Sequence, residues 1–291
     1  QILKLAVPNI VSNITVPLLG VVDLAIMGHL ESEIYIGAIA LGGIIFNFLY
    51  LGFGFLRMGM SGFTSQAYGS RNLPEAIVLL SRGLIVSLAG GLLFIMLQKP
   101  IEWVSFLILD GSEEVKSFAR SYFYIRIWAA PAALSVFVFN GWFLGMQNAR
   151  YPMIVTIFIN LANIGLNLIF VYVYDMKSDG VALGTVFAQY AGLLLSIALF
   201  SASYRRMIKY WMLERLKDLK SFKRFVYVNT DIFIRTICII FTLAFFTSVS
   251  AKEGDKVLAV NEILLQLVLS FSYCIDCFAH AAEALTGKFM G

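Results

Sequence analysis

About eight long apolar segments dominate this sequence and constrain its fold more than any other feature. A helix that crosses a membrane needs about 20 largely apolar residues, because it rises only 1.5 Å per residue. Every segment reaches that length, and several are long enough to tilt or kink. The sequence therefore predicts an all-α polytopic membrane protein. The segments lie near Leu3–Met27, Ile34–Ala67, Ala76–Leu97, Phe118–Met146, Pro152–Tyr174, Gly180–Tyr204, Phe225–Val249 and Val257–Thr286.

The composition excludes a soluble protein with a large core. The chain is 59% hydrophobic and 14% charged, whereas soluble domains are about 45–50% apolar and about 25% charged. Three prolines, Pro8, Pro17 and Pro131, lie inside apolar segments. Each would free a backbone carbonyl in mid-helix, which membrane proteins tolerate beside a cavity or a polar neighbour.

The charges of the loops alternate from one side to the other. Arg71, Arg150 and the basic stretch 205–224 follow even-numbered segments, while the other connections are acidic. Because positive loops stay in the cytoplasm, we expect a cytoplasmic amino end. The basic stretch itself is interpreted as a topology determinant on a partly helical loop, and binding of anionic lipid is the alternative.

The same loop divides the chain into 1–204, with six segments, and 225–291, with two. A faint repeat links the halves, because Thr64–Gly69 and Thr286–Gly291 both run from a threonine to a glycine at the end of a second segment. A six-segment unit returns to its starting side, so two such units would be parallel repeats about an axis along the membrane normal. Both ends of the sequence look cut, so we expect a fragment of a longer protein.

Asp23 interrupts the first apolar segment, and no basic residue lies within a helical turn of it. A carboxylate at membrane depth costs about 3 kcal/mol on insertion scales, so it tends to protonate, to bind a cation or to face a wet cavity. These are properties that a transporter needs. The plainer interpretation places Asp23 near the water interface.

Amide and hydroxyl side chains form polar pairs on the fifth and sixth segments. Asn163 and Asn167 are four residues apart and share a helix face, which Asn160 extends. Thr185 and Gln189 repeat the spacing on the next segment. With a carboxylate, such oxygens can form a small cation or proton site. They can equally form interhelical hydrogen bonds of about 0.6 kcal/mol each, with no role in transport.

A further polar stripe, Asp276, His280 and Glu283, occupies one face of the last segment. It suits a proton relay or substrate site, because histidine titrates near neutral pH and burial raises the pKa of a carboxylate. A structural ion pair, with Arg235 as candidate partner, is the second interpretation. A metal site is the third, but the D-x3-H-x2-E order lacks the HExxH spacing of zinc proteases, so no metal is expected.

Other polar residues carry weaker signals. Arg57 and Arg126 fall within apolar runs and would either face a cavity or snorkel to an interface. The three cysteines lack disulfide spacing and are interpreted as small packing residues. The sequence shows no Walker A loop, Gly-rich dinucleotide turn or nucleophile elbow, so ATP hydrolysis and acyl transfer have no support and no enzyme is expected.

Several segments, in this order, resemble the multidrug and toxic compound extrusion (MATE) family, and within it the DNA-damage-inducible F branch. AVPNIVSNITVPLLGVVDLAIMGHL resembles the first helix of that family, with an early proline and an acidic residue near the outer end. YIRIWAAPAALSVFVFNGWFLGMQNARYP resembles the fourth span and its turn. NLANIGLNLIFVY and GVALGTVFAQY resemble spans five and six, and VNTDIFIRTICI and IDCFAHAAEALTGKFMG resemble spans seven and eight.

The resemblance implies a bundle of two six-helix lobes around a central cavity. Residues 1–204 would form the complete amino-terminal lobe, 205–224 a cytoplasmic inter-lobe loop, and 225–291 two helices of the other lobe, without the last four. It also implies a multi-pass protein of the inner (cytoplasmic) membrane. The implied activity is secondary active efflux of amphipathic, often cationic, compounds by alternating access in exchange for H⁺ or Na⁺.

The resemblance also assigns roles residue by residue. Asp23 matches the coupling aspartate of the amino lobe, Asn163 the asparagine of span five, and Thr185 the threonine of span six. Asn167 departs from the family, where aspartate is common. Its amide removes a negative charge from the site, which favours H⁺ over Na⁺. Two residues match acidic positions of span eight: Asp276 and Glu283.

As partners we expect small-molecule drugs or metabolites and membrane lipids, with no nucleic acid and no cofactor, and we expect a monomer. Two alternatives stay open. One is a lipid-linked precursor flippase of the same superfamily, in which Arg57, Arg126 and Arg235 would hold pyrophosphate. The other is an intramembrane metalloenzyme that uses the polar stripe of the last segment.

Overall fold

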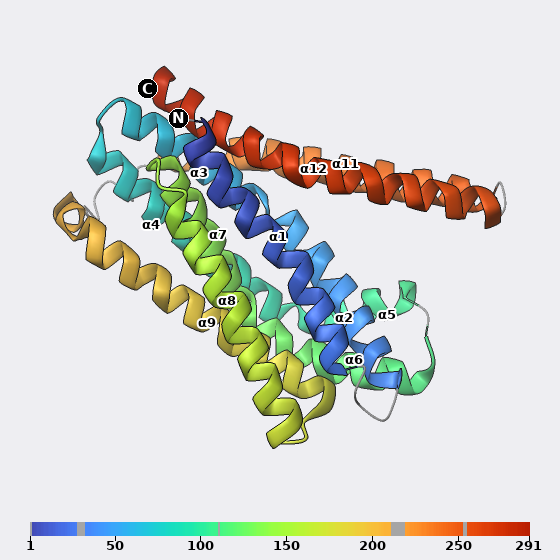
Figure 1. The fold of residues 1–291 in the computed structure, drawn as a ribbon. Coiled ribbons are helices and arrows are strands. Elements are labelled where there is room, and N and C mark those ends of the chain that lie inside the picture. Colours follow the sequence, from blue (N-terminus) through green and yellow to red (C-terminus); the bar gives the residue numbers. More distant parts are fainter. Residues whose placement is uncertain (1, 28–32, 110, 211–218, 253–254) are drawn as a thin grey trace.

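The computed structural model describes residues 2–27, 33–109, 111–210, 219–252 and 255–291, and all the regular structure in these ranges is helical (Figure 1). Each predicted apolar segment coincides with one helix or with two helices joined by a short break. The elements are α1 (Ile2–Met27), α2 (Glu33–Gly52), α3 (Phe55–Gly69), α4 (Leu73–Met96), α5 (Gln98–Ile108), α6 (Glu113–Arg126), η1 (Ile127–Ala129), α7 (Ala130–Gly145), α8 (Arg150–Leu168), η2 (Ile169–Val173), α9 (Lys177–Tyr204), η3 (Arg205–Tyr210), α11 (Leu219–Lys252) and α12 (Asp255–Met290).

Several helical stretches are long and apolar enough to cross a bilayer. Helices α1, α11 and α12 are 26, 34 and 36 residues long. Large apolar side chains face outward, and Leu161 on α8 and Leu194 on α9 are 64% and 67% exposed. Such a surface is stable only against lipid. Among the described residues, five stretches meet both length and hydropathy criteria: Ile34–Gly69, Leu73–Met96, Glu113–Gly145, Arg150–Val173 and Lys177–Tyr210.

Two of the predicted segments are interrupted. The second breaks at Phe53 and Gly54, between α2 and α3. The fourth contains the 3₁₀ turn η1 because Pro131 has no N–H for the carbonyl of Ile127; the N–H of Ala130 bonds to that carbonyl instead. The short helix α5 was not predicted.

Helix α7 forms the centre of the bundle, and nearly all of its residues are buried. It packs against α3, α4 and α9. On the α3 side two glycines four residues apart permit the contact, because a Cβ at Gly141 would overlap the carbonyl oxygen of Arg57 and a Cβ at Gly145 would lie 2.6 Å from the Cβ of Thr64. On the α4 side the buried indole of Trp142 donates to the carbonyl oxygen of Ala76 at 2.8 Å. Close helix contact through small residues is typical of membrane bundles.

The turns α3–α4 and α7–α8 share one construction. Arg71 and Gln147 follow their helices with φ of 55° and 63°, in the left-handed region that ends many helices. The next residue in each turn is an asparagine, Asn72 or Asn148, whose side chain accepts a backbone N–H at the start of the following helix. Both turns therefore reverse the chain tightly at the same end of the bundle (Figure 1).

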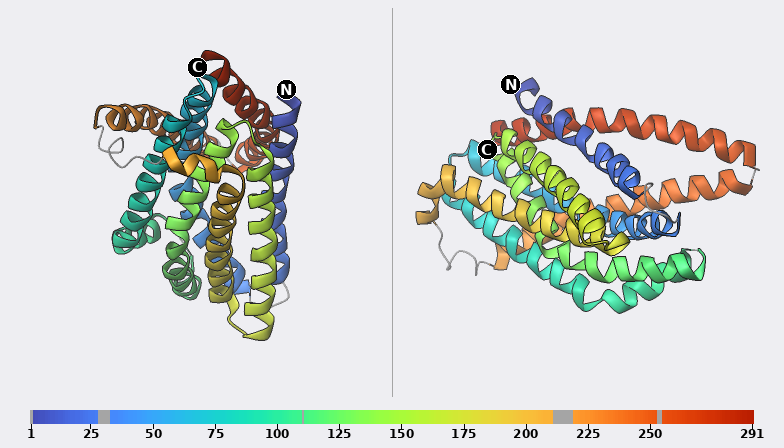
Figure 2. Two further views of the ribbon diagram at one scale, coloured as in Figure 1. Left: turned by 90° about the vertical axis from the view of Figure 1, so that its left-hand side faces the viewer. Right: turned by 60° about the horizontal axis from the view of Figure 1, so that its bottom comes forward.

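Helices α11 and α12 form a hairpin that extends away from the bundle, and the end of α12 packs on α3 (Figure 2). This contact is reciprocal. A Cβ at Gly69 would overlap the carbonyl oxygen of Lys288, and a Cβ at Gly291 would overlap that of Gln66. The sequence repeat pairs these same residues at one constant offset, so the contact has the pattern expected from two repeats related by a two-fold axis.

We predict that Gly141→Ala and Gly145→Ala lower the thermal midpoint of the purified full-length protein. The added methyl groups must displace α3, at a cost of about 1–3 kcal/mol each. Gly165→Ala on α8 is the matched control, since a Cβ there meets nothing within 4 Å. Equal midpoints for all three variants in a thermal unfolding assay would contradict the proposed role of these glycines.

Candidate functional site

The amide face of α8 is buried inside the protein. Asn160, Asn163 and Asn167 are 9%, 2% and 0% exposed, although α8 also presents apolar residues to the outside. A polar group in an apolar interior needs a hydrogen-bond partner, since lipid offers none. The positions of these three amides therefore depend on what the neighbouring helices provide.

A directional chain of hydrogen bonds links α8 to α9. Asn167 Nδ2 donates to Asn163 Oδ1 at 3.0 Å, and Asn163 Nδ2 donates to Thr185 Oγ1 at 3.0 Å. The hydroxyl of Thr185 donates in turn to the carbonyl oxygen of Val181 at 2.9 Å. The structure thus brings together three of the four residues that were predicted to form the ion site of the first lobe.

Small residues on α9 create the space for this chain. Gly180, Gly184, Ala188 and Gly192 recur every four residues and are all buried. Gly184 and Gly192 lie against Asn167 and Ile159 of α8. A Cβ at Gly184 would overlap the side-chain oxygen of Asn167. The close approach of α9 therefore allows a hydrogen-bonded amide chain to fit between two membrane helices.

Directly after this polar face, α8 widens into the π-helix η2, where the N–H of Tyr174 bonds to the carbonyl oxygen of Ile169 at 3.2 Å. Short π-helical turns often occur at functional sites. The wider turn ends α8 and leads to α9 through Asp175 and Lys177, which both have φ of 52°.

Helix α1 joins α8 to α12. On one side Asn160 Nδ2 donates to Thr15 Oγ1 at 3.0 Å. On the other side Asn13 Nδ2 donates to the sulfur of Cys277 at 3.2 Å. These α1 residues were not singled out from the sequence, although the polar spacing in NIVSNIT offered a signal. Cys277 packs in the interior, as expected for a structural cysteine.

Asp23 lies in α1, but its side chain is outside the part of the chain that the structure describes. The backbone still shows how far along the bundle Asp23 lies in comparison with Asn167 of α8. Helices α1 and α8 run parallel, because residues near the start of both share one buried cluster and Thr15 meets Asn160 further along. Asp23 is eight residues beyond Thr15, and Asn167 is seven beyond Asn160, so both rise about 11–12 Å from that contact.

The second polar stripe is separate from this network. His280 Nδ1 and Glu283 Oε2 are 3.7 Å apart on α12, and Asp276 is exposed. The Glu283 carboxylate lies against α3, where a Cβ at Gly62 would be 3.3 Å from Oε1. Among the described residues, no group of three His, Cys, Asp or Glu side chains could hold a metal ion.

The other arginines singled out from the sequence have different surroundings. Arg235 approaches the sulfur of Met58 at 3.9 Å. Among the described residues it forms no ion pair with the α12 stripe, in which Glu283 lies 3.7 Å from His280. Arg126 donates to the hydroxyl of Tyr122 and lies over the ring of Phe46 at 4.8 Å. Aromatic faces stabilise a guanidinium in such a position.

Comparisons with known proteins agree with this architecture. The MatE family model matches residues 8–169. DNA damage-inducible protein F of Escherichia coli (strain K12) is 39% identical over 292 residues, covering 99% of this chain and 62% of that protein. Multidrug and toxin extrusion protein 1 of Oryctolagus cuniculus is 32% identical and covers 77% of this chain and 39% of that protein.

The crystal structure of MATE in the bent conformation superposes with a TM-score of 0.87 at 20% identity, covering 99% of this chain and 64% of that one. This similarity shows that the chain has the same fold. The chain spans less than two thirds of the length of these proteins.

We predict that Thr185→Val destabilises the protein by about 0.5–2 kcal/mol, because the buried amide of Asn163 loses its acceptor on α9. Thr185→Ser keeps the hydroxyl and should retain most of the stability. Thermal unfolding of the purified variants measures both. If valine and serine were equally well tolerated, the hydrogen-bond chain would not hold α9 against α8.

Proposed function

The chain belongs to the MatE family, and from this premise we propose that it is part of a secondary active transporter. The protein would export amphipathic, often cationic, organic compounds in exchange for H⁺, with Na⁺ as the alternative ion. Multi-pass helices and similarity to multidrug and toxin extrusion protein 1 support this proposal. No cofactor and no catalytic step are part of it.

The observation that carries the proposal is the amide chain between α8 and α9, at the height of Asp23. Asn163, Asn167 and Thr185 form an ordered polar wall in the interior of a membrane protein. A carboxylate carried to the same depth by α1 would have polar groups within reach in otherwise apolar surroundings. Such an intramembrane acidic residue is expected to function in ion or proton transfer.

The proposed cycle uses α1 as the moving element. In the outward-open state Asp23 takes up a proton, which removes its charge and lets α1 repack toward α8 and α9. The cavity then narrows and the drug leaves. Rocking of the lobes exposes the site to the cytoplasm, where the proton is released. In the part of α1 whose side chains the structure describes, the hydrogen bonds from Asn160 to Thr15 and from Asn13 to Cys277 would break in this repacking.

The amide at Asn167 makes H⁺ the preferred coupling ion in this proposal. A bound Na⁺ is stabilised by oxygen ligands and by nearby negative charge, and an amide supplies the oxygen without the charge. Asp23 is then the one carboxylate that we assign to the site. The α12 stripe with Asp276, His280 and Glu283 is proposed as a second polar site of the other lobe.

The surroundings of the arginines favour drug efflux over flipping of a lipid-linked precursor. A flippase would need cations directed at pyrophosphate. Arg126 donates to the hydroxyl of Tyr122 and lies over the ring of Phe46. The protein's own groups therefore already engage this guanidinium group.

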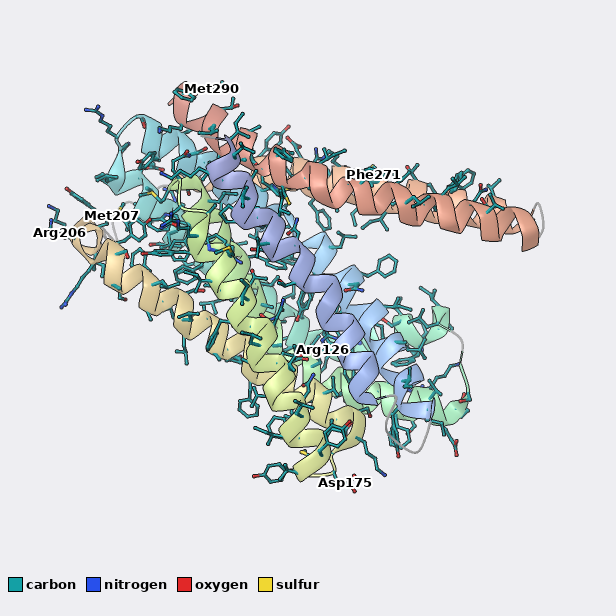
Figure 3. All side chains as sticks on the ribbon, in the orientation of Figure 1. Arg126, Asp175, Arg206, Met207, Phe271 and Met290 are labelled. Atoms are coloured by element: carbon teal, nitrogen blue, oxygen red, sulfur yellow. The ribbon has the colours of Figure 1, made fainter. Side chains whose placement is uncertain are left out.

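We propose a cytoplasmic amino terminus in the inner membrane and two lobes, 1–204 and 225–291, joined by 205–224, in a monomer. Figure 3 shows Arg206 at the end of the bundle that also holds the termini, and Asp175 at the opposite end. At the first end Arg71 lies in the α3–α4 turn, and Arg150 is the first residue of α8. This distribution follows the positive-inside rule.

We predict that Asp23→Asn in the full-length protein abolishes efflux of ethidium while expression stays normal, because the proton carrier is lost. Asp175→Asn is the matched control, since Asp175 is exposed and asparagine tolerates its left-handed conformation. Dye efflux from energised cells measures both. Wild-type efflux by the Asp23 variant would refute the proposal.

We predict that wild-type efflux continues when the Na⁺ gradient is collapsed and the pH gradient is kept. Asn167→Asp should make efflux respond to Na⁺, because it adds a negative charge beside Asn163. Ethidium transport in proteoliposomes with each gradient set separately provides the measurement. Loss of wild-type transport on collapse of the Na⁺ gradient would instead identify Na⁺ as the coupling ion.

A further inference from the structure

A basic cavity lies where the starts of α1 and α8 meet the end of α12. These helix ends lie at the end of the bundle that holds both termini (Figure 1). Its volume is about 260 Å³. The proposed transport mechanism does not use it. The residues that line it are Lys4, Leu5, Gln147, Asn148, Ala149, Arg150, Leu285 and Lys288.

The cavity has the chemistry of an anion site. Its lining includes three cationic side chains, from Lys4, Arg150 and Lys288, and two amides, but no carboxylate. Helix α8 is 19 residues long and begins at Arg150 in the cavity wall, with no acidic residue in its first turn. The positive end of its dipole therefore adds to the side-chain charges.

A second, apolar groove of about 560 Å³ adjoins the cavity and shares Leu285 with it. It runs along the outside of the same two helices, α1 and α12. The side chains of Leu3 and Phe289 in its walls are apolar, as suits contact with lipid tails. The remaining lining residues of the groove are Ile2, Ala282, Leu285 and Thr286.

We propose that the cavity and the groove together bind one anionic phospholipid. The phosphate of the headgroup lies among Lys4, Arg150 and Lys288, and an acyl chain lies in the groove. Basic pockets between membrane helices on the cytoplasmic side are suited to anionic headgroups. A soluble phosphate would use the cations but not the adjoining groove, so the lipid accounts for both features.

The position of the site gives the lipid a structural role. The side chain of Gln147 already donates across the site to the carbonyl oxygen of Ala284 at 2.8 Å, joining the turn before α8 to α12. A lipid phosphate bound by residues of α1, α8 and α12 adds a second link among the same elements. It would brace α1, the helix that the proposed cycle moves.

The first test compares binding of palmitoyl-oleoyl phosphatidylglycerol to the full-length wild-type protein and to the triple variant Lys4→Gln, Arg150→Gln, Lys288→Gln by native mass spectrometry. We expect about a hundredfold weaker binding in the variant, since each basic residue near a membrane surface contributes about fivefold. Arg150→Gln alone should show a partial loss if the triple variant fails to fold.

The triple variant Arg205→Gln, Arg206→Gln, Lys209→Gln is the matched control. It removes the same charge from η3, outside the cavity. Its lipid binding should equal that of the wild type. An equal loss of lipid binding in both triple variants would show that binding depends only on net charge, and would overturn the proposed site.

The second test separates the lipid from free phosphate. Ala282→Trp narrows the groove and leaves all three cations in place, so binding of phosphatidylglycerol should weaken and phosphatidylcholine should bind poorly to every variant. Inorganic phosphate should not displace the bound lipid. Displacement by inorganic phosphate would show that the cavity binds phosphate and not a phospholipid. Unchanged lipid binding by Ala282→Trp would show that no acyl chain lies in the groove, and would overturn the proposed site.

Discussion

The structure depends on one constraint, which is that polar groups buried in a membrane helix must find their hydrogen bonds inside the protein. Asn160, Asn163 and Asn167 on α8 meet it through Thr15 of α1 and Thr185 of α9. These bonds fix how α8 faces both neighbours. The small residues of α9 are the condition for this arrangement, because a larger side chain at Gly184 would occupy the space of the Asn167 amide.

Much of this could be predicted from the sequence because local patterns determine it. Apolar segments long enough to span a bilayer became helices, and a spacing of four residues placed Asn163 and Asn167 on one face. The interruption at Pro131 also follows from the chemistry of one residue. The sequence did not reveal α5 or the links of Asn13 to Cys277 and of Glu283 to α3, because such contacts depend on which helices pack together and in what register.

The contact between α3 and α12 explains the weak sequence repeat. The repeat was visible only as two short runs that end in glycine. In the structure Gly69 and Gly291 make the same close contact in exchanged roles, each against a carbonyl of the other helix. The same end of α12 carries Lys288, which lines the basic cavity together with Lys4 of α1. One short stretch of α12 therefore contacts α3 and also contributes to the basic cavity.

The central claim is that Asp23 of α1 carries the proton that is exchanged for drug, at the height of the amide chain between α8 and α9. Proton release on ethidium binding, followed with a pH indicator in weakly buffered solution of the purified full-length protein, tests it most directly. The account predicts that the wild type releases protons as ethidium binds, and that Asp23→Asn binds ethidium without release. Equal proton release by the variant would contradict it.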